Sequence, residues 1–415
     1  MSDMQSRKKP IHTAMNQFET SGNCLQIGNR SVVDIAAEAG DAPFYAYDLQ
    51  AMSTTVATLR EAMPSGLHLH YAMKANPMPE VVKHLAGLTD GLDVASAREL
   101  RVALSTGINP RLISFAGPGK SDEDLVTAIE GGVIINMESE REMARIAEIA
   151  QSKDLRPPVA IRVNPDFELK SSGMKMSGGP KPFGVDAERV PNMLRELAKL
   201  PLEFMGFHIF SGSQNLRPES IIDAQNKTFE LAFRLADAAP SPVQWLNIGG
   251  GLGVPYFPGE QRIDLQEISK NLSLLLAESQ KLFPEAEIVM ELGRYLVAES
   301  GVYVCRVIDK KISRGQTYLI TNGGLHHHLA ASGNFGQVIR KNYPVCIGNR
   351  VDSEDKENVS IVGPLCTPLD ILGDKMALPR ADVGDLVVVF QSGAYGYTAS
   401  PHLFLSHPEP SEIAI

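Results

Sequence analysis

The sequence has few cysteines, and their spacing does not suggest a metal site. Cys24, Cys305, Cys346 and Cys366 lie far apart in a chain of 415 residues, whereas zinc sites usually draw on closely spaced pairs. We therefore expect free, reduced thiols, which are typical of a cytoplasmic protein.

Long apolar runs and an excess of positive charge are also absent. No run approaches the roughly 18 residues that a membrane-spanning helix requires, and the basic residues at 7–9 are not followed by the apolar core of a signal peptide. The net charge of -10 disfavours nucleic acids and anionic membranes as partners, because both attract basic surfaces. No Walker A motif or dinucleotide fingerprint follows a first strand, so a nucleotide ligand is disfavoured as well.

The composition is that of an ordinary globular protein, with 43% hydrophobic and 21% charged residues. In the middle of the chain, short apolar runs alternate with longer helical patterns. Strands are expected at 68–73, 91–95, 112–116, 133–136, 158–163, 204–210, 244–248 and 287–291. Helices are expected between them, for example at 121–131, 139–150, 190–200 and 265–283. Eight such units in roughly 225 residues predict an α/β fold, a (β/α)8 TIM barrel; an open doubly wound sheet would seldom need eight.

The regions on either side of this alternation differ from it. Strand-like runs follow one another without helices near the C-terminus, and two more precede the barrel. These runs are at 24–27, 44–47, 302–308, 318–320, 359–362 and 386–390. They predict a C-terminal β-domain joined by the N-terminal strands, with loops over 334–357. The expected division is 1–45 for the tail and first strands, 46–295 for the barrel and 296–415 for the β-domain.

One lysine in this pattern is a candidate reactive residue. Lys74 ends the first barrel strand, where a turn follows at once through Asn76 and Pro77. Burial at a strand end lowers the pKa of a lysine and makes its neutral amine available for Schiff-base chemistry. The alternative is a lysine that extends its ammonium group to solvent from the end of the strand.

Other polar or unusual residues fall at the carboxyl ends of the expected strands, where reacting groups of such barrels lie. They are Asp93, Arg162, His208, Phe210, Ser213, Gly249, Gly250, Gly251, Glu291 and Arg294. Barrels often bind phosphate after strands seven and eight, and successive backbone N–H groups of a glycine loop can surround an oxyanion. A phosphate site and a reactive amine together indicate pyridoxal 5′-phosphate. Glu291 can then hold a proton on the pyridine nitrogen, which makes the ring an electron sink; alternatively, it forms an ordinary salt bridge with Arg294.

Several motifs together resemble the fold-type III pyridoxal-phosphate decarboxylases, the diaminopimelate and ornithine decarboxylase family. The resemblance covers about residues 40–408, and only the combination of motifs is specific. The motifs are at 71–76 (YAMKAN), 93–96 (DVAS), 249–251 (GGG), 291–294 (ELGR), 363–366 (GPLC) and 393–395 (GAY).

The resemblance implies a role for most of these residues. Lys74 would bind the cofactor covalently and Glu291 would contact its pyridine nitrogen, with Asp93 near the lysine. Ser213, the glycine triplet, Arg294 and Tyr395 would hold the phosphate. Cys366 would approach the cofactor of the other subunit of a homodimer and return a proton to Cα after CO2 has left, although free cysteine is also a common small buried hydrophobe.

The departures from the family concern the substrate. Diaminopimelate and ornithine decarboxylases follow this cysteine with an acidic residue that engages the distal amine, whereas Cys366 is followed by Thr367. Phe210 stands where the family has a stacking histidine, and a phenyl ring can still cover the cofactor. We take Thr367, Asp370 and His327 as candidate substrate contacts. No metal is expected at the three consecutive histidines that include His327, because neighbouring residues point in different directions.

The three histidines, the LCTP sequence and the GVPYF sequence resemble a specialised branch of the family. It contains the glutamyl-carrier-protein decarboxylase of butirosin biosynthesis and decarboxylases associated with siderophores and exosortases. We therefore predict decarboxylation of a conjugated or carrier-linked α-amino acid. The alternatives are a diaminopimelate decarboxylase, an amino-acid racemase of the same fold, and a binding protein without catalysis.

Overall fold

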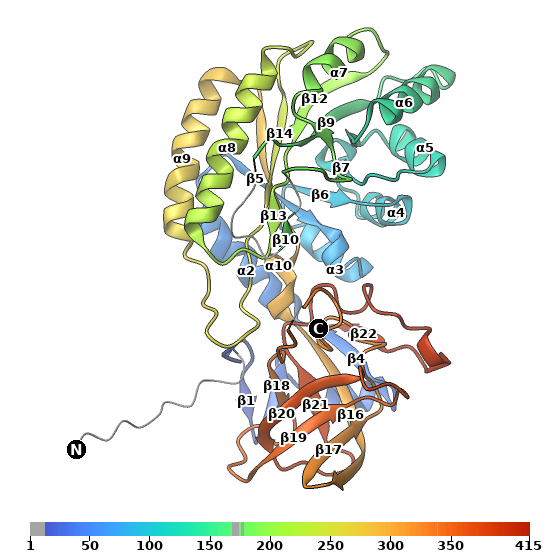
Figure 1. Cartoon of the computed structure of the whole chain (residues 1–415), viewed down its shortest axis with the longest axis vertical. Helices are drawn as coiled ribbons and strands as arrows, with labels where there is room; N and C mark the ends of the chain where they lie inside the picture. Colours follow the sequence, from blue (N-terminus) through green and yellow to red (C-terminus); the bar gives the residue numbers. More distant parts are fainter. Residues whose placement is uncertain (1–12, 168–173, 176–177, 338) are drawn as a thin grey trace, which may run out of the picture. The chain divides into compact units, whose positions relative to one another are not determined.

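The protein consists of two compact units in the computed structural model, which describes residues 13–167, 174–175, 178–337 and 339–415. The barrel unit contains Ser53–Val254 and Arg262–Leu296, and the β-unit contains Met1–Met52, Pro255–Gln261 and Val297–Ile415. Each unit has its own sheet (Figure 1). The first division thus follows Met52 rather than residue 45, and a short segment within the expected barrel range groups with the β-unit.

The barrel unit is a closed ring of eight parallel strands, which confirms the predicted fold class. The strands are β5 (Leu67–Ala72), β6 (Gly91–Val94), β7 (Ile113–Phe115), β8 (Ile134–Met137), β9 (Pro158–Asn164), β12 (Glu203–His208), β14 (Trp245–Gly250) and β15 (Glu287–Leu292). Pairing of β15 with β5 and of β8 with β9 completes the ring. Nearly all residues of these strands are buried, as expected for strands covered on both faces.

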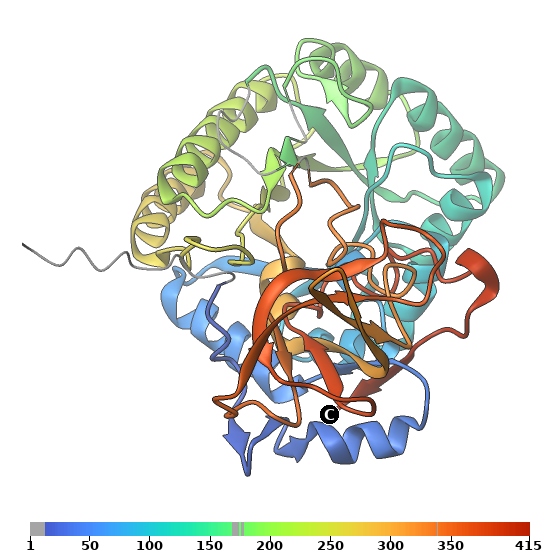
Figure 2. The same cartoon turned by 60° about the horizontal axis from the view of Figure 1, so that its bottom comes forward.

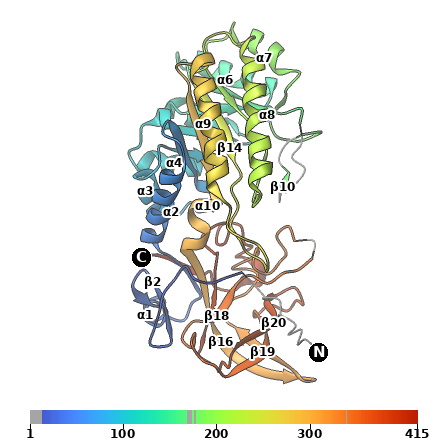
Figure 3. The ribbon, with the colours of Figure 1, turned by 90° about the vertical axis from the view of Figure 1, so that its left-hand side faces the viewer.

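Helices surround the strands, as Figure 2 shows. They are α2 (Leu49–Ala62), α3 (Pro79–Ala86), α4 (Ala97–Ser105), α5 (Asp122–Gly131), α6 (Glu140–Ser152), α7 (Val190–Leu197), α8 (Pro218–Ala236) and α9 (Leu265–Leu282). The side chains of Ser96, Ser121 and Ser139 accept backbone N–H groups at the starts of α4, α5 and α6. Such caps satisfy otherwise unpaired donors at a helix start. The long helices α8 and α9 pack against each other (Figure 3).

The β-unit is built on an eight-stranded sheet. It contains β4 (Phe44–Tyr47), β16 (Gly301–Ser313), β17 (Gln316–Thr321), β18 (Val345–Ile347), β19 (Lys356–Val362), β20 (Ile371–Pro379), β21 (Leu386–Val389) and β22 (Ser411–Ala414). Strand β4 pairs with β16 and β22, so residues from the N-terminal part of the chain take part in this sheet. Strand β2 (Cys24–Ile27) lies in a separate small sheet with β1 (Thr20–Ser21) and β3 (Arg30–Ser31). Its apolar side chains pack with α1 (Val32–Ala39) in one core cluster.

Three strands of the eight-stranded sheet, β18, β20 and β22, were not expected. Strand β18 lies within 334–357, so the prediction of loops throughout that range is wrong. Its three residues gain their pairing from β21, which a local pattern cannot indicate. Strand β20 contains Gly373, Asp374 and Lys375, and its pairing with β19 shifts register nearby. These interruptions hide its alternation in the sequence. In the described ranges, no helix combines the length and the apolar character needed to cross a membrane.

Candidate functional site

Lys74 lies directly beyond the carboxyl end of β5, in the short 3-10 turn Met73–Ala75. The hydroxyl of Tyr71 donates to the carbonyl of Asn76 at 2.8 Å and fastens this turn to the strand. The lysine side chain is 45% exposed within the chain. The expectation of a buried lysine is therefore wrong, because the turn lifts the side chain beyond the last strand residue.

The ammonium group of Lys74 is held by a buried carboxylate. Lys74 Nζ lies 3.1 Å from Glu291 Oε1, and His208 Nε2 lies 3.1 Å from Glu291 Oε2. Burial by itself raises the pKa of Glu291, but the charge of Lys74 and the hydrogen bond from His208 outweigh it. The pKa of this carboxyl group is therefore well below its usual range, and Glu291 is ionised at neutral pH.

Asp93 belongs to a buried polar chain that crosses neighbouring strands. Its Oδ1 lies 3.2 Å from His70 Nδ1 and accepts the Ser114 hydroxyl at 2.5 Å, and Asn136 Nδ2 donates to Ser114 Oγ at 3.2 Å. The other oxygen, Asp93 Oδ2, is buried and has no hydrogen-bond partner among the described residues. A Cβ on Gly91 would lie 2.3 Å from the His70 ring, so glycine makes room for this ring.

This buried polar chain contains residues that were not predicted from the sequence. His70, Ser114 and Asn136 were not predicted as site residues, although each is a polar residue inside an otherwise apolar strand. Buried polar residues need hydrogen-bond partners, so a polar residue inside an apolar strand is itself a sequence signal for such a site. Asp93 itself pairs in register with Ala72, two positions before Lys74.

Arg162 is held by a second buried carboxylate that the sequence reading also missed. Its Nη1 lies 2.7 Å from Glu138 Oε1, and its guanidinium lies over the Phe183 ring at 5.2 Å. Burial tends to raise the pKa of Glu138, but the charge of Arg162, together with that of Lys120, lowers it below its usual value. The predicted Arg162 is therefore paired and fixed at the end of β9.

The glycine triplet lies at the carboxyl end of β14, where Gly249 and Gly250 are the last strand residues and Gly251 follows them. Gly249 and Gly251 have φ values of 67° and 89°, a region that favours glycine. A Cβ on Gly250 would lie 2.0 Å from the Glu291 carbonyl oxygen, and one on Gly251 would lie 2.6 Å from the Gly212 carbonyl oxygen. Only glycine fits at these positions, and the loop is thereby fixed beside Glu291.

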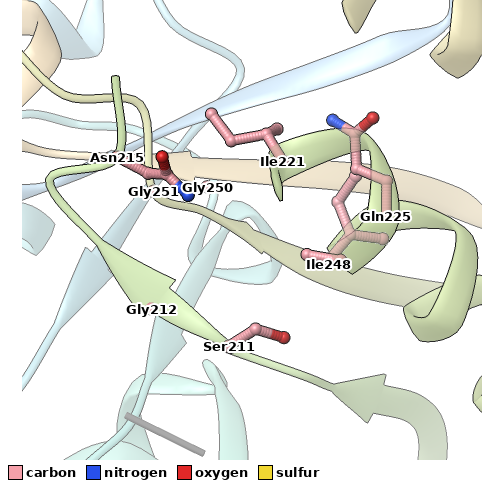
Figure 4. A pocket seen from close by; sticks show the side chains of 9 residues that line it. Ser211, Gly212, Asn215, Ile221, Gln225, Ile248, Gly250 and Gly251 are labelled. Atoms are coloured by element: carbon pink, nitrogen blue, oxygen red, sulfur yellow. The ribbon is translucent and has the colours of Figure 1, made fainter. Parts of the chain in front are cut away.

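A small pocket lies beside this loop, and Figure 4 shows its lining. Ser211 and Gly212 come from the segment around β13 (Gly212–Ser213), Gly250 and Gly251 from the loop, and Gln225 from α8. The predicted Ser213 neighbours this lining. The lining thus combines small residues with the larger side chains of Asn215, Ile221, Gln225 and Ile248.

Phe210 and Arg294 complete the barrel residues that were predicted. Lys74 Nζ lies 5.5 Å from the centroid of the Phe210 ring, and the ring contacts the position where Gly249 lacks a side chain. Arg294 begins the short helix α10 (Arg294–Val297) directly after β15. Lys74, Glu291, His208, Phe210 and the glycine triplet are therefore gathered at one end of the barrel.

These residues fit pyridoxal 5′-phosphate. The glycine loop packs closely against neighbouring backbone, Glu291 is an ionised carboxylate, and Lys74 is an accessible amine beside an aromatic ring. The unpartnered Asp93 Oδ2 adds a buried acceptor, which a donor of a bound group would satisfy.

The other predicted residues belong to the β-unit. Cys366 is exposed and Thr367 is half-buried, and Thr367 Oγ1 accepts the Leu369 N–H at 3.3 Å. Tyr395 has a φ of 53°, a rare backbone conformation for a bulky residue. Such strained residues often occur at functional sites.

Asp370 does not have the geometry of a substrate contact. It is 2% exposed, and its two oxygens accept the N–H groups of Leu325 at 2.6 Å and Leu365 at 2.9 Å. A Cβ on Gly324 or Gly363 would lie within 2.3 Å of its carboxylate. Asp370 therefore holds two loops of the β-unit together.

His327 is likewise engaged within the β-unit. Its Nε2 donates to the Pro408 carbonyl at 2.8 Å, so its Nδ1 accepts from the Tyr303 hydroxyl at 3.1 Å. Its ring lies 3.7 Å from that of His326, and His328 Nε2 lies 2.9 Å from Ser392 Oγ. In the part of the chain that the structure describes, no group of three or more His, Cys, Asp or Glu side chains is placed to hold a metal ion.

These three buried histidines predict acid sensitivity. Burial lowers the pKa of His326 to about 3, of His327 to about 4 and of His328 to about 3. Above pH of about 6.5 they are neutral in both folded and unfolded chains, so they contribute no pH dependence. Below that value only the unfolded chain takes up protons, so stability falls as pH falls. We expect a loss of about 2 kcal/mol per histidine between pH 7 and pH 5.

Urea unfolding of the β-unit, followed at both pH values, measures this effect. His328→Phe removes one buried imidazole, and its free energy of unfolding should change less with pH than that of the unchanged protein. Equal pH dependence of the two proteins would contradict the prediction.

Comparison with known proteins gives the family. Residues 49–298 match the model of the pyridoxal-dependent decarboxylase, pyridoxal binding domain. An L-glutamyl-[BtrI acyl-carrier protein] decarboxylase of Niallia circulans is 38% identical over 90% of this chain and 88% of its own. A diaminopimelate decarboxylase of Aquifex aeolicus is 30% identical over 94% of this chain and 90% of its own.

Solved structures agree with the sequence relatives. The diaminopimelate decarboxylase of Helicobacter pylori complexed with L-lysine superposes with a TM-score of 0.81 at 28% identity, covering 92% of this chain and 94% of that chain. The match extends across most of both chains, as do the sequence matches. The chain therefore belongs to the pyridoxal-dependent decarboxylases and is a pyridoxal-phosphate enzyme that decarboxylates an amino acid.

Proposed function

We propose that the protein decarboxylates an α-amino acid whose side chain is conjugated or attached to a carrier protein, with Lys74 and Cys366 as catalytic residues. The observation that carries the assignment is the contact of Lys74 with the ionised Glu291 beside the glycine loop. These groups supply what pyridoxal 5′-phosphate requires: an amine, a pyridine partner and a phosphate site.

Each barrel residue has a part in this proposal. Bound pyridoxal 5′-phosphate supplies an electron sink for the electrons left when CO2 departs. Lys74 would hold the cofactor covalently, and Glu291 would keep a proton on its pyridine nitrogen. Phe210 would contact the cofactor ring, and Asp93 would offer its buried Oδ2 as an acceptor.

The phosphate would be held by neutral and cationic groups. The N–H groups of Gly249, Gly250 and Gly251 lie in a loop that no larger residue could form, and Ser213, Arg294 and Tyr395 would complete the site. Arg162 would not bind the phosphate directly, because its charge is already paired with Glu138.

The substrate class rests on Thr367 and on the relatives. The Niallia circulans relative is named for an L-glutamyl-carrier-protein substrate, and a Staphylococcus aureus relative, 29% identical over 94% of this chain, for 2-[(L-alanin-3-ylcarbamoyl)methyl]-2-hydroxybutanedioate. Both named substrates carry their amino acid in conjugated form. Thr367 has no charge for a distal ammonium, its hydroxyl accepts from Leu369, and Asp370 is engaged by backbone N–H groups.

The specificity test compares free and conjugated substrates. A buried ammonium without a carboxylate costs several kcal/mol, so kcat/KM for free meso-diaminopimelate, lysine and ornithine should be roughly 100-fold or more below that for a carrier-linked glutamyl group. Release of CO2 from each substrate gives the rates. Comparable kcat/KM for diaminopimelate and the best conjugate would refute the proposed substrate class.

Thr367 also offers a gain-of-function test of the same proposal. Thr367→Glu adds the missing charge and should raise activity toward diaminopimelate, whereas Thr367→Gln has the same length without charge and should not. An equal response to both variants would show that charge at this position does not select the substrate.

We further propose a homodimer in the cytoplasm, with Cys366 of one subunit serving the cofactor held by Lys74 of the other. Exposure of Cys366 within its own chain and the free state of all four cysteines support this. Inactive Lys74→Ala and Cys366→Ala chains, when mixed, should therefore regain activity, because each hybrid dimer can assemble one intact site. Absence of rescue despite proven subunit exchange would place each site within a single chain.

A further inference from the structure

His208, the last residue of β12, contacts Glu291. Its Nε2 lies 3.1 Å from Glu291 Oε2, while Lys74 occupies the other carboxylate oxygen. His208 is 2% exposed. The two carboxylate oxygens of Glu291 therefore have different partners, the ammonium group of Lys74 on one and the imidazole ring of His208 on the other.

The surroundings of the ring indicate which nitrogen carries its hydrogen. His208 Nδ1 is buried and has no hydrogen-bond partner among the described residues. The rings of Phe210 and Trp245 lie edge-on to the imidazole, at centroid distances of 6.4 Å and 6.5 Å. A hydrogen on Nδ1 would be left unpaired in these apolar surroundings, which is costly. The geometry therefore assigns the hydrogen to Nε2, where Glu291 accepts it.

The two donors have different fates when the cofactor binds. Lys74 Nζ would be taken up in the covalent link to the cofactor and would no longer offer its ammonium group to Glu291. His208 would take no part in that link, so its contact with Glu291 could remain. Without it, one oxygen of a buried carboxylate would lose its partner and the carboxylate could turn.

We propose that His208 is a positioning residue, which holds Glu291 in one orientation and keeps it an acceptor for the pyridine N–H after Lys74 has left it. This inference rests on the proposed roles of Lys74 and Glu291. It predicts that loss of the Nε2 donor lowers the fraction of cofactor that is protonated at the pyridine nitrogen, even where the cofactor remains bound.

The test uses the full-length protein loaded with pyridoxal 5′-phosphate labelled with 15N at the ring nitrogen. The 15N chemical shift at neutral pH reports protonation directly. His208→Phe should shift the signal toward the unprotonated form and lower kcat by about 10- to 100-fold with little change in KM. His208→Gln keeps an N–H donor near the Nε2 position and should restore most of both readouts.

Matched variants separate positioning from folding. His68→Gln alters a histidine on β5, which pairs with β15; no contact of His68 with Glu291 is found among the described residues, so this variant should leave the 15N shift unchanged. His208→Met fills a similar volume without a donor and replaces the phenylalanine variant if that one does not fold. An unchanged 15N shift in the non-donor variant with bound cofactor would overturn the inference.

The outcome also distinguishes the inference from the proposed function. If borohydride reduction of the unchanged protein fails to fix the cofactor on Lys74, the roles of Lys74 and Glu291 fail, and the inference fails with them. If Lys74 is labelled but the His208 variants give the same 15N shift as the unchanged protein, the proposed function stands and the inference alone is wrong.

Discussion

Lys74→Ala is expected to abolish decarboxylation and the covalent attachment of the cofactor. Lys74 extends from the turn beyond β5 toward Glu291 and is accessible enough to react. Loss of a member of a covalent catalytic unit typically lowers kcat by roughly 10⁴- to 10⁶-fold, and we expect a decrease in that range. The purified protein should be yellow, and borohydride should bleach it while fixing the cofactor on the peptide that contains Lys74.

Lys83→Ala is the matched control for this experiment. Lys83 lies on α3 in the same unit and is exposed, so its loss should change neither colour nor kcat. Labelling of a different lysine, or retained activity in Lys74→Ala, would show that Lys74 is not the cofactor lysine.

Gly250→Ala is expected to have the second-largest effect, through a single methyl group. Its Cβ would lie 2.0 Å from the Glu291 carbonyl oxygen and 2.8 Å from Leu292 Cδ2. Because the first of these atoms is backbone, β14 and β15 must separate or the loop must move. We expect a stability loss of about 1–3 kcal/mol. We also expect kcat to fall about 100-fold, since small displacements of positioned groups have effects of that size.

Gly119→Ala provides the control for Gly250→Ala. A Cβ at Gly119 would have no atom within 4 Å and its φ is ordinary, so stability should change by about 0.5 kcal/mol at most. Thermal unfolding and cofactor titration of both variants give the comparison. Wild-type affinity for the cofactor in Gly250→Ala would contradict the role assigned to the loop.

The barrel could be predicted because its signals are local. Each parallel strand is an apolar run, and each helix has its own cap and apolar face. The expected ranges 91–95 and 158–163, for example, agree with β6 and β9 to within one residue at either end. The lysine, the glycine triplet and Glu291 followed from the rule that barrel chemistry lies at the carboxyl ends of strands.

Pairing between distant residues could not be predicted in this way. Strand β18 exists because β21 offers a partner, and its three residues carry too little pattern by themselves. Asp370 was expected near the substrate because of its place after Cys366. Of the two N–H groups that its carboxylate accepts, that of Leu325 comes from a loop 45 residues earlier in the chain, and only that of Leu365 is local.

The sequence by itself determined the barrel, the residue types at its carboxyl end and the absence of an acidic residue after Cys366. Tertiary structure alone decided which of these groups meet. The order of the strands in the barrel places β12 and β15 on either side of β14 and thereby brings His208 to Glu291. It also joins His70, Asp93, Ser114 and Asn136 across four strands. The physical reason is that buried polar atoms must find partners, and those partners come from other strands, which only the folded barrel brings side by side.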